Sequence, residues 1–459
     1  MTRRSGPPLS VGLDGIGYMG IATGLAFARR GWTVYAYDIL PEVRAAVRAG
    51  RSPYREPGLS SLLRSEVRRG RFVVVESLEE LARRAGGIFL CLPTPRGPGG
   101  RIDLGPLRTG VAQLGRALRS ADGYRVVVVK STVVPGTTER VVEPLLRRTS
   151  GRGLGRLGVA MNPEFLAEGT MVRDAMYPQR VVLGVSDPAA ARWLKAVYRP
   201  FNAPVFELSP SGAELVKYSS NALLALKVSF ANETARLAER LGLNVDDVMD
   251  AVGSDVRLGR GFLRAGPGFG GSCFDKDLRA IVRRGRELGV RLRSYETALA
   301  INDDQVDHVL ELVRTAVGRL RGRTIVVLGL AFKPGTDDIR DSRAFPIVEG
   351  LLRAGAHVRV HDPEALANFR RAWVAEHPAP SGRLRFCGSV PEALDRADAA
   401  VLQADWPAYV RWPAGWSRRM RTPLLIDLRR AVPGSVQRRG RLQVVALGVG
   451  RPTDGGTGR

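Results

Sequence analysis

The amino-acid sequence predicts an α/β protein in which two Rossmann-like, doubly wound domains are joined by a central all-helical domain with one long helix. Short apolar strands alternate with helices over residues 9–208 and again over residues 306–450, as in parallel sheets covered by helices. Between them, within residues 209–305, the stretch 213–241 contains no glycine or proline. One continuous helix of roughly 43 Å is therefore expected there.

The composition is that of an ordinary globular protein. Hydrophobic residues make up 44% of the 459 residues and charged residues 25%, and no apolar run is long enough to span a membrane. The basic segment 1–8 is not followed by the apolar core of a signal peptide. The three cysteines are far apart and the four histidines are scattered, so neither a disulfide framework nor a metal cluster is expected. We therefore expect a cytoplasmic protein of about three domains.

The formal charge of +25 is the unusual bulk property. Only six of the 70 basic residues are lysines and 64 are arginines. They are dispersed and form no nucleic-acid-binding motif, so a solvated basic surface is the first interpretation and weak polyanion binding the second. Arginine does not lose its proton in proteins. A lysine kept inside a motif, as at Lys217, Lys276 and Lys333, therefore indicates chemistry that needs an ammonium able to titrate.

The first domain begins with a dinucleotide-binding pattern. A strand at residues 9–13 leads into the turn Gly15–Gly20, a helix is expected over residues 21–30, and the strand 33–37 ends at Asp38. This is G-x-G-x-x-G between a strand and a helix, with an acidic residue at the expected spacing. Asp38 can accept hydrogen bonds from ribose hydroxyls and would repel a 2′-phosphate. The predicted cofactor is therefore NAD rather than NADP.

The alternation of strands and helices continues. Further strands are expected at residues 72–75, 87–91, 124–129 and 157–160. Two segments follow the carboxyl ends of such strands, where ligands bind in doubly wound sheets: Cys91–Pro95 and Lys130–Thr138. Either segment alone could be a proline-containing turn. Asp14 is an oddity, because an apolar residue is usual at the end of the first strand.

Two carboxylates follow the strand at 157–160. Glu164 and Glu168 lie in Asn162–Gly169, and four-residue spacing would place them on one face if this segment is helical. A solvated pair is the usual outcome of such spacing. A catalytic pair is the alternative.

The long central helix carries unusual polar residues. Ser211 and Glu214 form a predicted capping box, and the helix should end at Gly242. Its apolar composition predicts burial nearly all round, and its length suits a two-fold dimer seam. One stripe contains Lys217, Asn221, Ala225, Val228 and Asn232. Buried polar groups need partners, so Lys217 and Asn221 are either in a structural ion pair or face a substrate.

The third region repeats the α/β pattern without a G-x-G-x-x-G turn. A connecting helix is expected at 302–320 and another at 346–354, with strands at 324–328, 357–360, 399–402 and 424–426. Lys333 and Arg429 follow strand ends, where they would attract an anionic ligand. The glycine-rich tail 451–459 is expected to be disordered.

Gly266–Asp277 combines a glycine-rich loop with a thiol. Its four glycines exclude a regular helix or strand interior, and Cys273 follows them, with Lys276 and Asp277 close behind. A nearby ammonium favours the reactive thiolate. The alternative is a surface loop that leads into a helix and carries an idle cysteine.

The ordered set of motifs resembles the UDP-glucose/GDP-mannose dehydrogenase family from about residue 9 to residue 450. The motifs are GIGYMG, LPTP, STVVPGTT, NPEFLAEG, AELVKYSSNALLALKVSFANE, GFGGSCFDKD, GLAFKPGTDDIRDS and DLR. This resemblance implies a four-electron, NAD-dependent oxidation of the C6 alcohol of a nucleotide sugar to a carboxylate. No metal is implied, and a homodimer through the central helix is expected.

The resemblance also implies residue roles. Cys273 would trap the aldehyde as a thiohemiacetal, and a second hydride transfer would leave a thioester for water to hydrolyse. Lys217 and Asn221 would stabilise oxyanions, while Asp277, Thr132 and Glu164 would handle water and protons. Implied cofactor contacts are Gly15, Gly17, Tyr18, Met19, Gly20, Asp38, Pro93, Thr94, Thr132, Glu168, Lys276 and Arg340. Implied substrate contacts are Glu164, Phe165, Leu166, Glu168, Lys217, Asn221, Arg257 (to a neighbouring subunit's substrate), Phe262, Leu263, Gly268, Phe269, Gly270, Lys333 and Arg429.

The sequence departs from the family's motifs at two places. The run Asp427–Arg430 reads D-L-R-R where the family has D-G-R-N, and Ala167 stands where arginine is common.

The runs 177–184 and 255–259 resemble the UDP-glucose branch of the family. GDP-mannose, UDP-N-acetylmannosamine and UDP-N-acetylglucosamine remain alternatives. So do a two-electron dehydrogenase and a non-catalytic protein that binds NAD or a nucleotide sugar.

Overall fold

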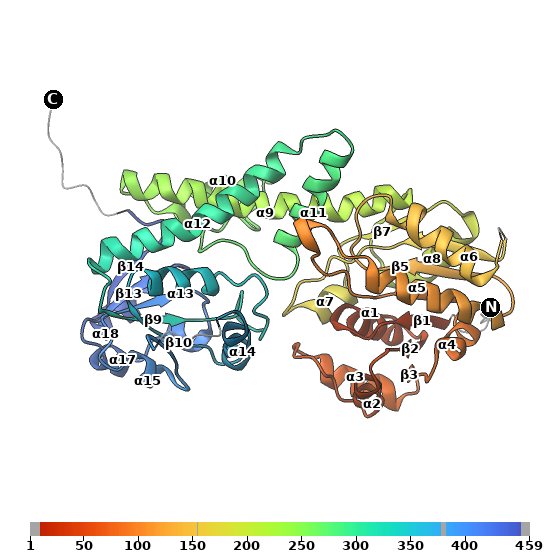
Figure 1. Ribbon diagram of the computed structural model, residues 1–459, viewed down its shortest axis with the longest axis horizontal. Helices are drawn as coiled ribbons and strands as arrows, with labels where there is room; N and C mark the ends of the chain where they lie inside the picture. The colour runs from red at the N-terminus through yellow and green to blue at the C-terminus, as the bar shows by residue number, and fades with distance from the viewer. Residues whose placement is uncertain (1–9, 154, 378–381, 451–459) are drawn as a thin grey trace. The chain divides into compact units, whose positions relative to one another are not determined.

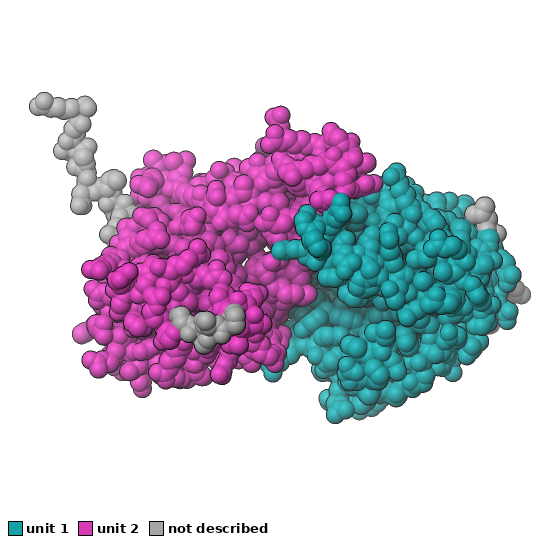
Figure 2. Space-filling view, viewed as in Figure 1, with its two compact units in different colours: residues 1–220 teal, residues 221–459 magenta. Residues whose placement is uncertain are grey.

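The computed structural model describes residues 10–153, 155–377 and 382–450. The chain divides into two compact units, residues 1–220 and 221–459, and each is described by itself (Figure 2). The predicted basic segment 1–8 and the predicted disordered tail 451–459 lie outside the described residues. No described helix is long and apolar enough to cross a membrane.

The first unit is built on an eight-stranded sheet (Figure 1). Its order is β3-β2-β1-β4-β5-β6-β7-β8, parallel except where β7 meets β6. The strands are β1 (Ser10–Asp14), β2 (Thr33–Tyr37), β3 (Phe72–Val74), β4 (Gly87–Leu90), β5 (Arg125–Val129), β6 (Leu157–Met161), β7 (Val181–Val185) and β8 (Val205–Leu208). The valine run of β5 is almost fully buried, as expected for a central parallel strand covered on both faces.

Helices cover both faces of this sheet, with one apolar cluster on each face. They are α1 (Tyr18–Arg29), α2 (Pro41–Arg48), α3 (Leu59–Arg68), α4 (Leu78–Arg84), α5 (Gly105–Ala117), α6 (Glu143–Ser150), α7 (Met171–Met176) and α8 (Pro188–Tyr198). The predicted strands are present within about one residue of their expected bounds. Strands β7 and β8 were not predicted.

The second unit contains a six-stranded, wholly parallel sheet in the order β11-β10-β9-β12-β13-β14. The strands are β9 (Thr324–Leu328), β10 (His357–His361), β11 (Leu384–Phe386), β12 (Ala399–Leu402), β13 (Leu424–Asp427) and β14 (Gln443–Ala446). Its helices are α13 (Ala344–Arg353), α14 (Leu366–Glu376), α15 (Val390–Leu394), α16 (Pro407–Arg411), α17 (Ala414–Arg419) and α18 (Gly434–Gly440).

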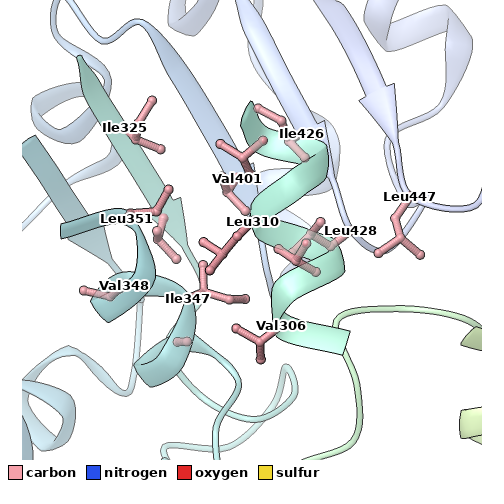
Figure 3. Close-up of a cluster of buried hydrophobic side chains, with 14 of the residues drawn as sticks. Val306, Leu310, Ile325, Ile347, Val348, Leu351, Val401, Ile426, Leu428 and Leu447 are labelled. Atoms are coloured by element: carbon pink, nitrogen blue, oxygen red, sulfur yellow. The ribbon is translucent and has the colours of Figure 1, made fainter. Parts of the chain in front are cut away.

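Long helices precede this sheet: α9 (Pro210–Leu241), α10 (Val245–Ser254), α11 (Phe274–Glu287) and α12 (Arg293–Val317). Helix α12 begins nine residues before the predicted connecting helix. Figure 3 shows Val306 and Leu310 of α12 beside Ile347 and Leu351 of α13, against buried strand residues such as Val401. The α/β fold class, with two Rossmann-like sheets and a central helical region, is confirmed.

Helix α9 corrects two expectations about its ends and its burial. Ser209, not Ser211, caps the helix, because its hydroxyl accepts a hydrogen bond from the Gly212 amide. The predicted partner Glu214 instead accepts hydrogen bonds from Gly136 and Thr138. The helix is also not buried all round, since Leu223 and Phe230 are 61% and 49% exposed.

Candidate active site

The turn Gly15–Gly20 follows β1 where the strand order reverses between β1 and β4. Gly15 has a φ of 101°, and a Cβ added there would lie 2.5 Å from the Cys91 carbonyl oxygen. A Cβ at Gly20 would lie 2.1 Å from the Gly15 oxygen. Tertiary packing therefore requires both glycines, as the tight turn of a dinucleotide site predicts.

Gly17 differs, because no described atom lies within 4 Å of a Cβ added there. It also precedes α1, whose N-terminus no described side chain caps. Open space beside uncapped amides fits an approaching pyrophosphate. Tyr18 and Met19 begin the helix, and the Tyr18 ring packs on Tyr54 at 4.4 Å between centroids. These residues fit the predicted dinucleotide.

Asp38 immediately follows β2 and lies beside this turn. Its Oδ2 accepts a hydrogen bond from the Ile16 amide at 2.8 Å and its Oδ1 accepts one from Leu40 at 3.0 Å. The side chain is partly exposed and keeps lone pairs for ribose hydroxyls. Asp14 is buried nearby, and burial together with the Asp38 charge raises the pKa of Asp14 to about 7.

The segments that follow β4 and β5 meet. The Thr94 hydroxyl, beside Pro93, donates to the Thr132 carbonyl at 2.9 Å. The Ser131 hydroxyl donates to the Leu92 carbonyl at 2.6 Å. The two loops therefore form one edge at the carboxyl ends of the strands, where ligands of doubly wound sheets bind.

Glu164 and Lys217 form a buried ion pair, with 2.9 Å between Oε1 and Nζ. Lys217 is thus in an ion pair, which was one of the two alternatives for it, and its partner Glu164 is itself a predicted site residue. Glu164 lies in a loop rather than a helix, so the condition for a shared helical face with Glu168 is not met. Glu168 is partly buried on this same loop. Burial opposes ionisation of Glu164, but Lys217 and the Leu166 amide outweigh it and lower the pKa of this carboxyl.

Phe165 packs between two cations in this loop. The Arg180 guanidinium lies 4.0 Å from the ring centroid and the Lys217 ammonium 5.6 Å. Such cation–π contacts hold both charges in place. Arg180 was not predicted as a site residue, although it lies in the run 177–184 that resembles the UDP-glucose branch.

Lys130 is a further buried cation that the sequence analysis quoted in a motif without giving it a role. Its ammonium donates to Asn162 Oδ1 at 2.7 Å and contacts the Tyr198 hydroxyl at 3.3 Å. Burial lowers the pKa of Lys130 to about 8, although the Cys91 and Glu164 charges oppose that shift. Because lysine is scarce in this sequence, its presence at position 130 could have indicated a functional residue.

In the second unit, Cys273 is exposed and occupies the N-cap position of α11. Its Sγ lies 3.6 Å from the Ser272 hydroxyl. A helix N-terminus stabilises negative charge through its amides, which suits a nucleophilic thiolate. The local geometry therefore favours a reactive cysteine over an idle one.

Asp277 lies one turn after Cys273 on α11 and is 1% exposed. Its Oδ2 accepts from the Asn221 amide at 2.8 Å and its Oδ1 accepts from the Lys276 ammonium at 2.7 Å. These bonds fix the orientation of a buried carboxylate. The structure thus joins three predicted residues, and the ammonium expected beside the thiol is paired with Asp277.

The backbone of the cysteine loop, residues 266–273, is hydrogen-bonded by asparagine side chains of two long helices. Asn302 of α12 bonds both the amide and the carbonyl of Phe269, and Asn232 of α9 accepts from the Gly266 amide. The Gly271 amide donates to the Arg340 carbonyl at 3.0 Å. Buried amide side chains that satisfy a loop in this way make it rigid.

Two of the loop glycines are required by close packing. Gly268 has a φ of 106°, and an added Cβ would lie 2.6 Å from Asn302 Oδ1. A Cβ at Gly270 would lie 2.4 Å from the Asp341 carbonyl oxygen. The family resemblance implied that these glycines contact the substrate. The structure shows that the protein's own packing also requires them.

Arg429 follows β13 and is oriented by two bonds. Its Nε donates to the Gln403 carbonyl at 2.7 Å, and its amide donates to Asp427 Oδ1 at 2.9 Å. Burial lowers the pKa of Arg429, but arginine stays protonated in proteins. A desolvated cation at the carboxyl end of a parallel sheet suits an anionic ligand. Lys333 follows β9, with its ammonium 5.3 Å from the Phe332 ring centroid.

Other predicted residues are paired on the surface or buried. Arg340 bonds Asp338, and Arg257, 84% exposed, bonds Asp255. Phe262 has a φ of 65° and lies 6.1 Å from the Phe274 ring. Leu263 is buried in the apolar core, so its side chain is part of the packing. Among the described residues, no cluster of three or more His, Cys, Asp or Glu could hold a metal.

The chain is similar to known proteins over most of its length. Three models of the UDP-glucose/GDP-mannose dehydrogenase family match in order: the NAD binding domain at residues 10–202, the central domain at 211–304 and the UDP binding domain at 326–433. A UDP-glucose 6-dehydrogenase of Pseudomonas aeruginosa is 39% identical over 450 residues, which are 96% of this chain and 97% of the relative.

Two archaeal proteins extend the comparison. A UDP-glucose 6-dehydrogenase of Haloferax volcanii is 38% identical over 92% of this chain and 97% of its own length. The solved structure of a UDP-glucose dehydrogenase from Pyrobaculum islandicum superposes with a TM-score of 0.88 at 36% identity and covers 98% of this chain and 99% of that one. The chain therefore belongs to the UDP-glucose/GDP-mannose dehydrogenase family and carries its NAD-binding domain, as the ordered motifs predicted.

Proposed function

We propose that the protein is a UDP-glucose 6-dehydrogenase that oxidises the C6 alcohol of UDP-glucose to the carboxylate of UDP-glucuronate. The observation that carries this proposal is Cys273 at the N-terminus of α11, one turn before a buried Asp277 held by Asn221 and Lys276. A simple alcohol dehydrogenase needs no thiol. An aldehyde that must be oxidised further does need a nucleophile that forms a thioester.

NAD, when bound at the Gly15–Gly20 turn, supplies a hydride acceptor, and the four-electron oxidation uses two such cofactors in succession. The alcohol loses a hydride and a proton to give the aldehyde. The Cys273 thiolate then adds to the aldehyde carbon, and the oxygen takes up a proton to give a thiohemiacetal. Loss of a second hydride and that proton gives a thioester. Water hydrolyses the thioester to the acid and releases the thiol.

We assign the charge stabilisation in these steps to Lys217 and Asn221, which lie one turn apart on α9. The ion pair of Lys217 with Glu164 is buried, and charges in a water-poor site act strongly on a developing oxyanion. Both partners are fixed before substrate arrives, because the Leu166 amide also binds Glu164.

We assign proton transfer and the handling of the hydrolytic water to Glu164, Thr132 and Asp277. The two carboxylates are ordered by hydrogen bonds, which is what general acid–base catalysis needs for alignment. The remaining cofactor and substrate contacts implied by the family motifs, among them Lys333 and Arg429 for the nucleotide, are part of the same proposal.

The decisive experiment measures the stoichiometry of the purified protein. We expect two NADH per UDP-glucose and a carboxylate product, while Cys273→Ser should form no net acid. Cys387→Ala is the matched control, since Cys387 is buried in another apolar cluster, and it should keep activity. Acid formation by the serine variant at the wild-type rate would refute the thioester route.

The nucleotide sugar itself needs a panel. We expect the highest kcat/KM for UDP-glucose, compared with UDP-N-acetylglucosamine, UDP-N-acetylmannosamine and GDP-mannose. The support is the 38–39% identity to two relatives named as UDP-glucose 6-dehydrogenases. A higher kcat/KM for another sugar would move the assignment within the family, and no turnover on any of them would refute the dehydrogenase function.

We also propose a homodimer through α9. Leu223, Phe230 and Leu237 are spaced by seven residues and are 61%, 49% and 59% exposed. An exposed row of large apolar side chains suits a second copy related by a two-fold axis. Light scattering should give twice the chain mass. Phe230→Glu should give the monomer mass, whereas the exposed control Leu288→Glu should not. A wild-type monomer would refute the proposal.

A cytoplasmic location is proposed on cysteine usage. All three cysteines are free, and two are buried, as expected where thiols stay reduced. Cell fractionation should find the protein with cytoplasmic markers. Recovery with the membranes or outside the cell would contradict this location.

A further inference from the structure

Arg430 has a backbone conformation that suits asparagine, the residue of the family pattern D-G-R-N. Its φ is 52°, in the left-handed region that residues other than Gly, Asn and Asp adopt at a cost. Leu428 of the same run is fully buried in the core beneath α12 (Figure 3). The leucine therefore has a packing explanation, whereas the arginine needs one from its side chain.

The Arg430 side chain bridges three segments that are distant in sequence, and it is 5% exposed. Its Nε donates to Asp246 of α10 at 2.8 Å, and its Nη1 donates to the Leu447 carbonyl at 2.9 Å. Its Nη2 donates to the Ala265 carbonyl at 2.8 Å. Ala265 immediately precedes Gly266, the first residue of the cysteine loop. One guanidinium thus ties α10 and the end of β14 to the entry of that loop.

A second arginine strengthens the same attachment. Arg260 lies 3.5 Å from Asp246 through its Nη2, donates to the Leu263 carbonyl and bonds Asp250. The segment also packs closely on α10, because a Cβ added at Gly253 would lie 2.7 Å from the Arg260 Cα. Two arginines that share Asp246 therefore hold the segment leading into the loop.

The neighbouring Arg429 contacts the next residue of the loop. A Cβ added at Gly266 would lie 3.2 Å from Arg429 Nη1. Arg429 and Arg430 thus contact Gly266 and Ala265, and both arginines come from the turn that follows β13. An anionic ligand bound at Arg429 would therefore contact the same turn whose arginines contact the first residues of the cysteine loop.

We propose that Arg430 is a positioning residue that fixes the entry of the cysteine loop and couples it to the nucleotide-binding turn at Arg429. This inference rests on the proposed function. A nucleophile must be held close to the attacked carbon, and a displacement of about 1 Å can cost as much as a hundredfold in rate. The desolvated contacts of Arg430 offset its backbone cost.

The test compares Arg430→Asn with Arg396→Asn. Arg396 shares the φ of 52° and is exposed, so both substitutions relieve the same backbone cost but only one removes the bridge. We expect Arg430→Asn to lower kcat for UDP-glucose roughly tenfold or more, leave the KM for NAD unchanged, and speed amide hydrogen exchange across residues 265–272. Arg396→Asn should match the wild type in all three.

Two further variants keep the test decisive. Arg430→Lys retains the charge but not the three-way contact, so it should restore only part of kcat. Asp246→Asn should act on the same loop, and its combination with Arg430→Asn should be less than additive, because the two residues share one interaction. This set separates a positioning role from simple loss of stability.

A melting temperature lowered in Arg430→Asn, with kcat within about twofold of wild type and unchanged loop exchange, would overturn the proposal. If the wild type oxidises no nucleotide sugar, the proposed function fails. The exchange comparison still decides the bridge in that case, because it needs no turnover.

Discussion

The two sheets of this protein share a topology and differ in what their turns can bind. The first six strands of the N-terminal sheet and all six of the C-terminal sheet follow the same order about β1 and β9. In both, a glycine of positive φ follows the first strand, Gly15 at 101° and Gly329 at 96°. An aspartate at the end of the second strand then binds the amide after that glycine, Asp38 at 2.8 Å and Asp362 at 2.7 Å.

The aspartates differ in their remaining contacts. Asp38 is partly exposed and accepts one other bond, from Leu40. Asp362 is 2% exposed and accepts from Leu330, Ala331, Glu364, Ala365 and the Trp406 indole. A carboxylate saturated in this way is structural. The comparison teaches that the same turn geometry can serve a ligand or the fold, depending on which lone pairs are left exposed.

The largest expected effect comes from replacing each of the two aspartates by alanine. Asp362→Ala should lower the free energy of unfolding by about 4 kcal/mol or more, because several buried donors lose their acceptor. Asp38→Ala should cost little stability but weaken NAD binding. Denaturant unfolding and NAD titration check both. A stable Asp362→Ala protein, or an Asp38→Ala protein with wild-type NAD affinity, would break the comparison.

Glycines of the two turns should show the same contrast between a loss of stability and a loss of NAD affinity, with smaller effects. A Cβ at Gly329 would lie 2.6 Å from the Ala404 nitrogen, so Gly329→Ala should destabilise by about 3 kcal/mol. Gly17→Ala meets no described atom within 4 Å and should keep the melting temperature. Its added methyl should instead reduce NAD affinity. Calorimetry and NAD titration on the two variants test this contrast.

The smallest expected effect concerns Asp14, whose place in β9 is taken by Leu328. Burial raises the pKa of Asp14 to about 7 from an ordinary value of 3.8, so the folded state holds its proton when the unfolded state has lost it. Stability is therefore highest below about pH 4 and falls as pH rises to about 7, by at most about 1.4 kcal/mol for each pH unit.

Asp14→Leu should remove this fall, and the difference in unfolding free energy from wild type should grow between pH 4 and pH 7. The reciprocal Leu328→Asp should introduce a similar fall in the second sheet. Unfolding measured across that pH range checks both. A constant difference between wild type and Asp14→Leu would show that folding does not raise the pKa of Asp14.

Local patterns predicted most of the strands, although not β7, β8, β11 or β14, and they predicted the nucleotide turn, because these depend on nearby residues. The valine run of β5 and the spacing from Gly20 to Asp38 are readable without tertiary contacts. The capping box at Ser211 failed because Glu214 found buried donors at Gly136 and Thr138, more than seventy residues away. The exposed face of α9 was missed because leucine and phenylalanine do not reveal whether their neighbour is the core or solvent.

The candidate site divides in the same way. The ordered motifs named Cys273, Lys217, Glu164, Asn221 and Asp277, and the structure pairs Lys217 with Glu164 and Asn221 with Asp277. No local pattern gave these pairings, because each joins residues more than fifty positions apart. Lys130 and Arg430 were not assigned roles for the same reason, since their partners are defined only by folding.

The fold class and the family followed from the amino-acid sequence, because both depend on residue types at short spacings, whereas the reactive role of the cysteine loop stays a prediction. Only the tertiary structure decided that Cys273 caps α11, that Asp277 is held from both oxygens, and that Arg430 fastens the entry of the loop. The physical reason is that buried polar groups must find partners, and folding alone selects which distant groups those partners are.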